Sequence, residues 1–237
     1  MNIRKFNILL LTLLSFFVLS CSATRDFERA ELTRVSRSFF GLYKLTINSE
    51  GQPQAGSVAS GALIYKDDKN SWILTAGHFC IDDENLTPEN PIPKVTSGEI
   101  ILSNIRGEET VGHVAIVARK FDACIIKAEL TEDDPLILSE APPKWGEKIF
   151  YTGAPMGFHM KNILLLYEGR YSGEDIQNAI YAVPATFGAS GSPIVNKYGQ
   201  LIGMVYAVHG GFPHITLSLT HSQLKEVLKV TKYLSSR

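Results

Sequence analysis

The sequence has no surplus of charge of either sign, because 23 lysines and arginines stand against 24 aspartates and glutamates and the formal net charge is −1. A protein that binds the phosphate backbone of nucleic acid needs an excess of cations, so this balance argues against a nucleic-acid partner. Hydrophobic residues make up 45% of the 237 residues. This ordinary globular composition can bury one sizeable core or two small cores packed together.

Metal-binding patterns are also missing. The sequence has six histidines and three cysteines, yet it contains no His-Glu-x-x-His motif. His209 and His214 might suggest zinc, but no further Cys or His pair lies at zinc-finger spacing near them. We therefore expect neither a metal nor a cofactor.

Long apolar runs are scarce, and the longest lies near the start. Arg4 and Lys5 precede an apolar run from Phe6 to Leu19, which is too short to span a bilayer comfortably and is typical of a signal-peptide core. The sequence predicts export of the protein.

The apolar run ends in Val18-Leu19-Ser20-Cys21, which is similar to the lipobox of bacterial lipoproteins. That resemblance implies cleavage before Cys21 and attachment of a diacylglyceryl group to its sulfur. We expect a lipoprotein signal peptide over residues 1–20, a polar tether over 21–34 and a lipid anchor in a membrane of the cell envelope. An ordinary secretory signal, cut near Ser22 or Ala23, is the alternative.

A serine set between glycines, Gly188-Ala189-Ser190-Gly191, is a candidate nucleophile. Glycines permit a sharp turn in which backbone N–H groups point to the space beside the hydroxyl, as the oxyanion of acyl transfer requires. The serine also needs a base to remove its proton.

Two upstream residues complete a catalytic set. His78 follows the apolar run Ser71 to Leu74, and Asp122 follows the run Val114 to Val117, so each stands near the end of a predicted strand. The chain order is His, Asp, Ser, whereas an α/β-hydrolase has the order Ser, acid, His. No aspartate follows Ser190 and the only later glutamate is Glu226, which excludes the hydrolase order.

Five segments together are specific. They are Leu74-Thr75-Ala76-Gly77-His78, Asp122-Ala123, Gly153-Ala154-Pro155-Met156-Gly157, Gly188-Ala189-Ser190-Gly191-Ser192-Pro193 and Ile202-Gly203-Met204-Val205. With them the chain resembles the trypsin-like serine proteases of chymotrypsin fold, of the bacterial kind that includes the HtrA and glutamyl endopeptidase families. The resemblance implies a catalytic triad of His78, Asp122 and Ser190, with an oxyanion hole formed by the N–H groups of Gly188 and Ser190.

Turn residues divide the chain into short strands that suit an all-β fold of two packed six-stranded antiparallel barrels. We expect the first barrel over residues 35–132, the second over 133–219, and a C-terminal helix over 220–237. The helix is indicated by the capping-box pattern from Thr220 to Gln223 and by apolar residues at helical spacing. Its expected role is structural, with partner binding as the alternative.

Two further cysteines stand two residues after the proposed triad members, Cys80 after His78 and Cys124 after Asp122. Because the triad members must be neighbours, the cysteines should be close as well, and export permits a disulfide. We predict a Cys80–Cys124 bridge; two buried free thiols are the alternative.

The same resemblance places the specificity pocket between two segments that include Thr186, Phe187, Tyr206, Ala207 and Val208 as candidate substrate-binding residues. Neither segment contains an acid, so a preference for Arg or Lys before the scissile bond is not expected. A small or medium apolar side chain is the predicted preference.

One departure from the digestive members concerns activation. They carry an aspartate just before the nucleophile, which pairs with a newly cut N-terminus, and this chain has Ala189 there. We expect an enzyme that needs no cleavage beyond signal removal.

The predicted function is that of an exported, lipid-anchored serine endopeptidase acting on peptide or protein substrates. The alternative is a catalytically silent binding module with the same fold on a membrane anchor, because a fold does not guarantee activity. The sequence does not predict an oligomeric state.

Overall fold

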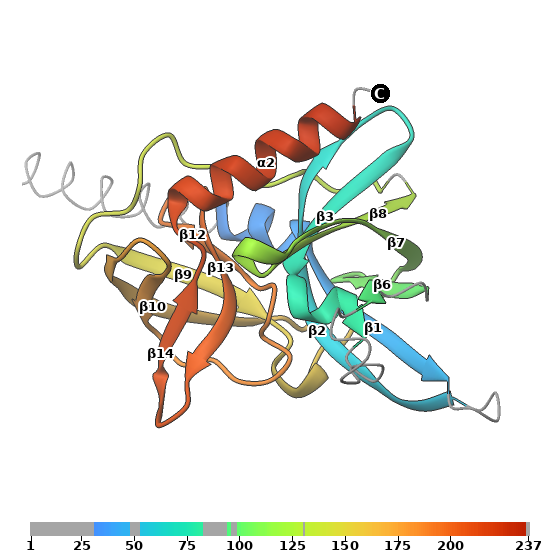
Figure 1. The fold of residues 1–237 in the computed structure, drawn as a ribbon, viewed down its shortest axis with the longest axis horizontal. Coiled ribbons are helices and arrows are strands. Elements are labelled where there is room, and N and C mark those ends of the chain that lie inside the picture. The colour runs from blue at the N-terminus through green and yellow to red at the C-terminus, as the bar shows by residue number, and fades with distance from the viewer. Residues whose placement is uncertain (1–30, 48–52, 83–93, 96–98, 130, 236–237) are drawn as a thin grey trace, which may run out of the picture.

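The computed structural model describes residues 31–47, 53–82, 94–95, 99–129 and 131–235. Its main features are two closed six-stranded antiparallel barrels and a helix, which confirms the predicted fold class (Figure 1). The expected signal peptide and Cys21 lie outside the described residues. No helix among the described residues is long and apolar enough to cross a membrane.

The first barrel closes in the order β1-β2-β3-β8-β7-β6, with β1 paired to both β2 and β6. Its strands are β1 (Phe39–Ile47), β2 (Pro53–Lys66), β3 (Asn70–Ala76), β6 (Ile100–Asn104), β7 (Glu109–Ala118) and β8 (Ala123–Glu129). A small two-stranded sheet of β4 (Ile81–Asp82) and β5 (Lys94–Val95) follows β3 in the chain.

The second barrel closes in the order β10-β11-β14-β13-β12-β9. Its strands are β9 (Lys148–Gly153), β10 (Leu165–Glu174), β11 (Ala179–Ala182), β12 (Pro193–Asn196), β13 (Leu201–His209) and β14 (Phe212–Ser218). Every predicted strand has a counterpart.

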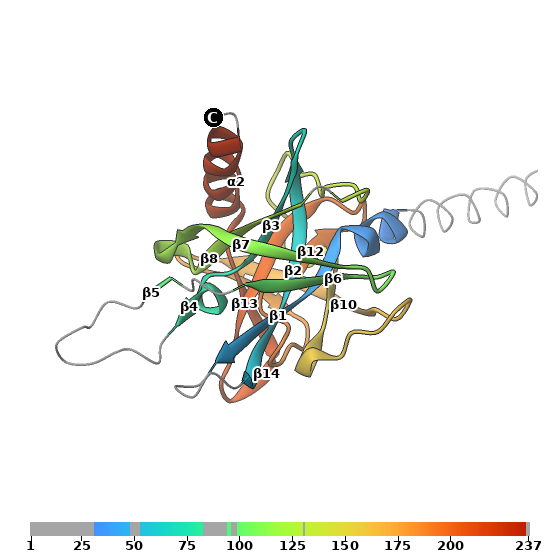
Figure 2. The same cartoon turned by 90° about the vertical axis from the view of Figure 1, so that its right-hand side faces the viewer.

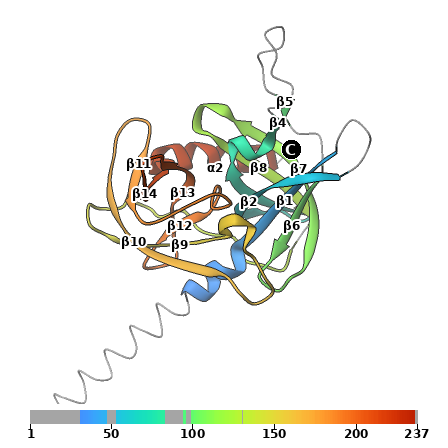
Figure 3. The ribbon, with the colours of Figure 1, turned by 90° about the horizontal axis from the view of Figure 1, so that it is seen from below.

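Buried apolar side chains of the described residues form three clusters. One fills the first barrel around Leu42 and Ile73, and another fills the second barrel around Tyr151 and Tyr181. The third joins residues of both barrels, such as Leu74 and Met204, at the seam where the barrels pack side by side (Figure 3). The seam between the barrels is therefore an apolar core. Because protein cores are closely packed, side chains at the edge of this one are held in fixed positions.

Helix α2 (His221–Ser235) lies outside the barrels and contacts β13 of one barrel and β2 of the other (Figures 1 and 2). The predicted capping box is present: the Thr220 N–H donates to Gln223 Oε1 over 2.9 Å, and the Gln223 N–H donates to Thr220 Oγ1 over 3.3 Å. Leu224 and Val227 are buried in the seam cluster. The helix thus supports both barrels.

Residues 31–38 are helical, although residues 31–34 were expected to belong to a tether. Only two apolar residues mark the helical period here, Leu32 and Val35, and this pattern is too short to recognise in the sequence. Val35 is fully buried in the seam cluster, and Leu32 packs against the same cluster. Tertiary packing, with a 2.8 Å ion pair between Glu31 and Arg34, accounts for the helix.

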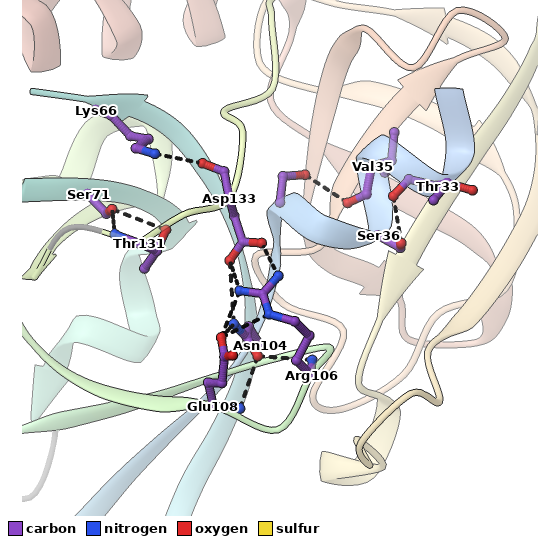
Figure 4. A network of polar contacts seen from close by, with 11 residues as sticks. Thr33, Val35, Ser36, Lys66, Ser71, Asn104, Arg106, Glu108, Thr131 and Asp133 are labelled. Atoms are coloured by element: carbon purple, nitrogen blue, oxygen red, sulfur yellow. Dashed lines mark hydrogen bonds and ion pairs between the residues drawn. The ribbon is translucent and has the colours of Figure 1, made fainter. Parts of the chain in front are cut away.

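A polar cluster fixes the start of the segment that connects the barrels (Figure 4). Asp133 is 3% exposed, and its carboxylate accepts two hydrogen bonds from the Arg106 guanidinium, over 2.6 and 3.1 Å. Arg106 also donates to Glu108, and Lys66 donates to the Asp133 carbonyl oxygen. The connection is therefore tied to the first barrel before it crosses to the second.

Candidate active site

Strand pairing brings His78 and Asp122 together. Strands β3 and β8 pair along their whole length as far as Ala76 and Ala123. His78 lies in the 3-10 turn that follows β3, and Asp122 directly precedes β8. Two residues that are 44 positions apart in the chain thus lie at the same end of one strand pair.

The carboxylate of Asp122 holds His78 by two hydrogen bonds. Its Oδ1 accepts the backbone N–H of His78 over 2.7 Å, and its Oδ2 lies 2.8 Å from Nδ1 of the imidazole. An ionised carboxylate only accepts, so this bond places the ring proton on Nδ1 and leaves a lone pair on Nε2. Asp122 itself has φ of 48°, a left-handed conformation uncommon outside glycine, and its carbonyl oxygen accepts the Gly77 N–H over 2.8 Å.

Ser190 comes from the other barrel. It lies in the loop between β11 and β12, and its Oγ is 3.1 Å from Nε2 of His78. The three candidate triad residues therefore form one hydrogen-bonded series, from Asp122 through His78 to Ser190. The carboxylate and base belong to the first barrel, and the hydroxyl belongs to the second.

The two candidate oxyanion donors are fixed by the carbonyl groups of their own peptide units. The carbonyl oxygen of Phe187 accepts the Met156 N–H over 2.6 Å, and that of Ala189 accepts the Ser192 N–H over 2.9 Å. In a trans peptide the N–H points opposite to the carbonyl, so the N–H groups of Gly188 and Ser190 are directed away from these partners. Neither N–H has an acceptor among the described residues. Both N–H groups can therefore donate hydrogen bonds to a molecule bound beside the serine hydroxyl.

Ser60 holds the nucleophile loop from the first barrel, a role that no pattern in the sequence indicates. Its N–H donates to the Ser190 carbonyl oxygen over 2.8 Å, and its hydroxyl donates to the Gly188 carbonyl oxygen over 2.7 Å. The same hydroxyl accepts the Ala154 N–H over 3.0 Å. Ser60 is fully buried in the middle of β2. Its neighbours in the sequence are those of an ordinary strand residue.

Glycines permit the close approach of these segments. A Cβ on Gly191, where φ is +86°, would lie 1.9 Å from the Ser60 carbonyl oxygen. A Cβ on Gly77 would lie 2.8 Å from the backbone carbon of Asp122. Real Cβ atoms do not approach other atoms so closely, so both positions require glycine.

A cavity of about 480 Å³ opens beside Ser190 and His78. All five candidate substrate-binding residues line it: Thr186, Phe187, Tyr206, Ala207 and Val208. Ser57, Val58 and Phe79 also line it, and no pattern in the sequence indicates these three residues. None of the lining residues is an aspartate, glutamate, lysine or arginine.

Tyr206 lines the cavity, and its hydroxyl has a hydrogen-bond partner. Its hydroxyl donates to Oδ1 of Asn178. Partial burial, together with the negative charges of Asp122 and Asp175, raises the pKa of Tyr206 above its ordinary value. The phenol therefore stays neutral and adds no charge to the part of the cavity that it lines.

The predicted disulfide is present and joins Cys80 to Cys124. Both residues are buried in the core of the first barrel, two positions beyond His78 and Asp122 respectively. Among the described residues, no three His, Cys, Asp or Glu side chains gather in a group able to hold a metal ion.

Comparison with known proteins yields matches in sequence and in fold. The family model described as a trypsin-like peptidase domain matches residues 59–204. The curated relatives include proteins named serine protease HtrA-like from Staphylococcus aureus strains MRSA252 and USA300, each 25% identical over 199 residues. That match covers 76% of this chain and 24% of each relative, so the chain spans about a quarter of their length.

Solved structures share the fold at low sequence identity. The serine endoprotease from Yersinia pestis has a TM-score of 0.66 and 16% identity, over 85% of this chain and 65% of that one. The active form of the Rv3671c protease from M. tuberculosis has a TM-score of 0.64 and 16% identity, over 83% and 81%. Because the family model covers more than half of its residues, the chain belongs to the trypsin-like peptidase family, with relatives of the HtrA type.

Proposed function

We propose that this protein is a serine endopeptidase that hydrolyses peptide bonds through an acyl-enzyme on Ser190. The observation that carries the proposal is the hydrogen-bonded series from Asp122 through His78 to Ser190, with bonds of 2.8 and 3.1 Å, at the edge of a cavity. Its geometry is suited to removing the serine proton as the hydroxyl attacks a carbonyl carbon.

In the first half of the reaction, Ser190 Oγ forms a bond to the carbonyl carbon and its proton passes to Nε2 of His78. The carbonyl electron pair moves to oxygen, where the N–H groups of Gly188 and Ser190 donate to the negative charge. Collapse of this intermediate breaks the bond between carbon and nitrogen. The leaving amine takes the proton from Nε2, and an ester remains on Ser190.

In the second half, water replaces the amine. Its proton passes to Nε2 of His78 while its oxygen attacks the ester carbon. The carbon–oxygen bond to Ser190 then breaks, and the serine takes the proton back. Asp122 keeps the proton of the neutral imidazole on Nδ1 throughout and stabilises the ring when it is positively charged.

For the residue before the scissile bond we propose a small or medium apolar side chain. The wall formed by Val205, Ala207 and Val208 is apolar, and no lining residue carries the negative charge that an arginine or lysine would need. Profiling with a peptide library tests this preference, and dominant cleavage after Arg or Lys would contradict it.

We further propose that the enzyme is active without proteolytic trimming. Ala189 precedes the nucleophile and is fully buried among apolar residues, so it offers no carboxylate to a new N-terminus. Mature protein that is inert until trimmed would contradict the proposal.

Export and lipid anchoring through Cys21 complete the proposed function. The supporting pattern is the lipobox-like end of the N-terminal apolar run. Replacement of Cys21 by serine should move the protein from the detergent phase to the aqueous phase in a phase-separation assay. Equal partitioning of both proteins into detergent would contradict the anchor.

The direct test of the enzyme is labelling by a fluorophosphonate probe. The unaltered protein should be labelled, and Ser190→Ala should abolish labelling. Ser172→Ala removes an exposed hydroxyl on β10 and is a matched control that should retain labelling. Absence of labelling in unaltered, folded protein would favour the silent binding module instead.

A further inference from the structure

A cavity of about 520 Å³ lies between helix α2 and the segment that connects the barrels. The end of β2 and residues 135–138 form the apolar part of its lining, in which Ile64 and Leu136 are buried. We call this cavity the lysine groove, because three lysines of α2 line it as well: Lys225, Lys229 and Lys232.

The positive charge of these lysines is not neutralised inside the groove. Among the described residues, none of the three forms an ion pair. No aspartate or glutamate lines the groove. Glu226 is the one acid of α2, and Asp134 precedes the lining part of the connection, but neither belongs to the lining. Electrostatic complementarity therefore favours an anionic ligand in the groove.

The spacing of the lysines indicates a ligand with more than one negative charge. Positions 225, 229 and 232 share one face of the helix, and seven residues of helix span about 10 Å. An ion pair needs its charged atoms within about 4 Å, so a ligand with two or more carboxylates pairs with more of these lysines than a ligand with one. In an extended polypeptide, alternate side chains lie on one side about 7 Å apart, which fits along this row.

The apolar part of the lining adds a second requirement. Ile137 is 59% exposed at the groove, and the buried Ile64 and Leu136 lie in its recess. A flat membrane surface cannot reach residues in a recess, whereas side chains of a polypeptide can. Lysine side chains extend along apolar surface and keep their charged ends in solvent, so one ligand can make apolar and charged contacts together.

The lysine groove is separate from the candidate active site. Strand β2 contributes to both, because Val58 lines the active-site cavity and Ile64 lines the groove. The six residues from Val58 to Ile64 span about 20 Å of strand. No residue lines both cavities. A ligand in the groove therefore leaves the active site open.

We propose that the lysine groove binds an extended polypeptide segment in which acidic and apolar residues alternate. The acidic side chains pair with the lysines of α2, and the apolar side chains on the opposite side of the segment pack against Ile64, Leu136 and Ile137. A protein that carries such a segment is held on the enzyme without filling its active site. The inference goes beyond the proposed peptidase function and does not depend on it.

Fluorescence anisotropy with short labelled peptides tests the proposal on the purified protein. The first peptide alternates Glu and Leu over about six residues, roughly 20 Å when extended. The second has Ser in place of each Leu, and the third has Lys in place of each Glu. We expect saturable binding of the first peptide and at least about 10-fold weaker binding of the other two, because each lacks one of the two kinds of contact.

Two variants, each with the same loss of three positive charges, locate the binding. The groove variant replaces Lys225, Lys229 and Lys232 by glutamine. Because each exposed ion pair changes an affinity by roughly 2- to 5-fold, this variant should bind the first peptide about 10- to 100-fold more weakly. The control variant replaces three exposed lysines outside the groove by glutamine, and its affinity should stay within about 2-fold of the unaltered protein. These lysines are Lys144, Lys161 and Lys197.

A third variant tests the apolar contact without a change of charge. Ile137→Ser alters an exposed side chain, and the backbone hydrogen bond from the Leu201 N–H to the carbonyl oxygen of residue 137 remains. It should narrow the difference in affinity between the Glu/Leu and Glu/Ser peptides by at least about 3-fold. An unchanged difference would contradict the apolar contact.

The remaining outcomes are distinct. Binding that is unchanged in the groove variant, or reduced equally in the control variant, would overturn the lysine groove. Absence of peptide binding together with lysine-dependent binding to vesicles of phosphatidylglycerol and phosphatidylcholine would overturn it in favour of a membrane-facing surface. Fluorophosphonate labelling reports the proposed function separately and should be the same in all variants. Absence of labelling in unaltered protein that still binds the peptide would overturn the peptidase alone.

Discussion

Replacement of Ser60 by alanine should weaken both stability and catalysis, although Ser60 does not belong to the proposed triad. The change removes one hydroxyl, which donates to the Gly188 carbonyl oxygen and accepts the Ala154 N–H. Both partners are buried, and among the described residues neither the Gly188 carbonyl oxygen nor the Ala154 N–H has a second hydrogen-bond partner, so the change leaves both groups unpaired. An unpaired buried polar group costs about 1–3 kcal/mol, so two such groups should lower the free energy of unfolding by about 2–6 kcal/mol.

For a domain of this size, such a loss corresponds to a decrease of about 4–24 °C in the melting temperature. The value of kcat should fall about 10- to 100-fold, because complete loss of one oxyanion donor costs about 10²–10³-fold and Gly188 would be only partly misplaced. The backbone N–H of Ser60 still donates to Ser190, which keeps the loop close to the first barrel.

Thermal melting followed by far-UV circular dichroism and steady-state hydrolysis of one peptide measure the two effects. Ser172→Ala, which removes an exposed hydroxyl, is the control and should change neither quantity. A Ser60→Ala protein that melts within 2 °C of the unaltered protein (about 1 kcal/mol or less) and retains its kcat would refute this reasoning.

Three further changes test other parts of the site and its support. Gly77→Ala places a Cβ 2.8 Å from the backbone carbon of Asp122, so kcat should fall at least about 100-fold; a variant with normal kcat would contradict the proposed role of that contact. Replacement of both Cys80 and Cys124 by alanine opens a loop with a sequence separation of 44 and should lower the free energy of unfolding by about 3–4 kcal/mol, measured by urea titration; an unchanged midpoint would argue against the bridge. Hydrogen bonds from its arginine partner lower the pKa of Glu108 to about 2 from 4.5, so its stabilising effect is full above about pH 4.5 and is lost as the pH falls through about 2. Glu108→Gln should therefore be less stable than the unaltered protein at pH 5, and the difference should disappear near pH 2, whereas a constant difference would contradict this assignment.

Features that depend on local pattern were predictable from the sequence. The strands are short apolar segments between turn residues, and the helix start is a capping box whose two hydrogen bonds, between Thr220 and Gln223, are present. The closeness of His78 and Asp122 was expected from the triad that the resemblance to trypsin-like proteases implies, and the pairing of β3 with β8 brings them together. The cysteine pairing followed from that neighbourhood.

Features that depend on the packing of distant segments were not predictable. Ser60 has the same local surroundings as any strand residue, and only the docking of the second barrel gives its hydroxyl two partners. The helix over residues 31–38 likewise forms because Val35 is buried in the apolar cluster between the barrels. The bidentate contact between Arg106 and Asp133 joins a hairpin to the connection between barrels, and no spacing in the sequence indicates it.

The division of the site between two barrels makes hydrolysis a sensitive reporter of how the halves are docked. His78 and Asp122 move with one barrel and Ser190 with the other, and Ser60 joins them across the seam. A slight parting of the halves would lengthen the contact between imidazole and hydroxyl while leaving every strand ladder intact. On gradual heating or denaturant addition, turnover should therefore cease before the spectroscopic signature of the sheets is lost.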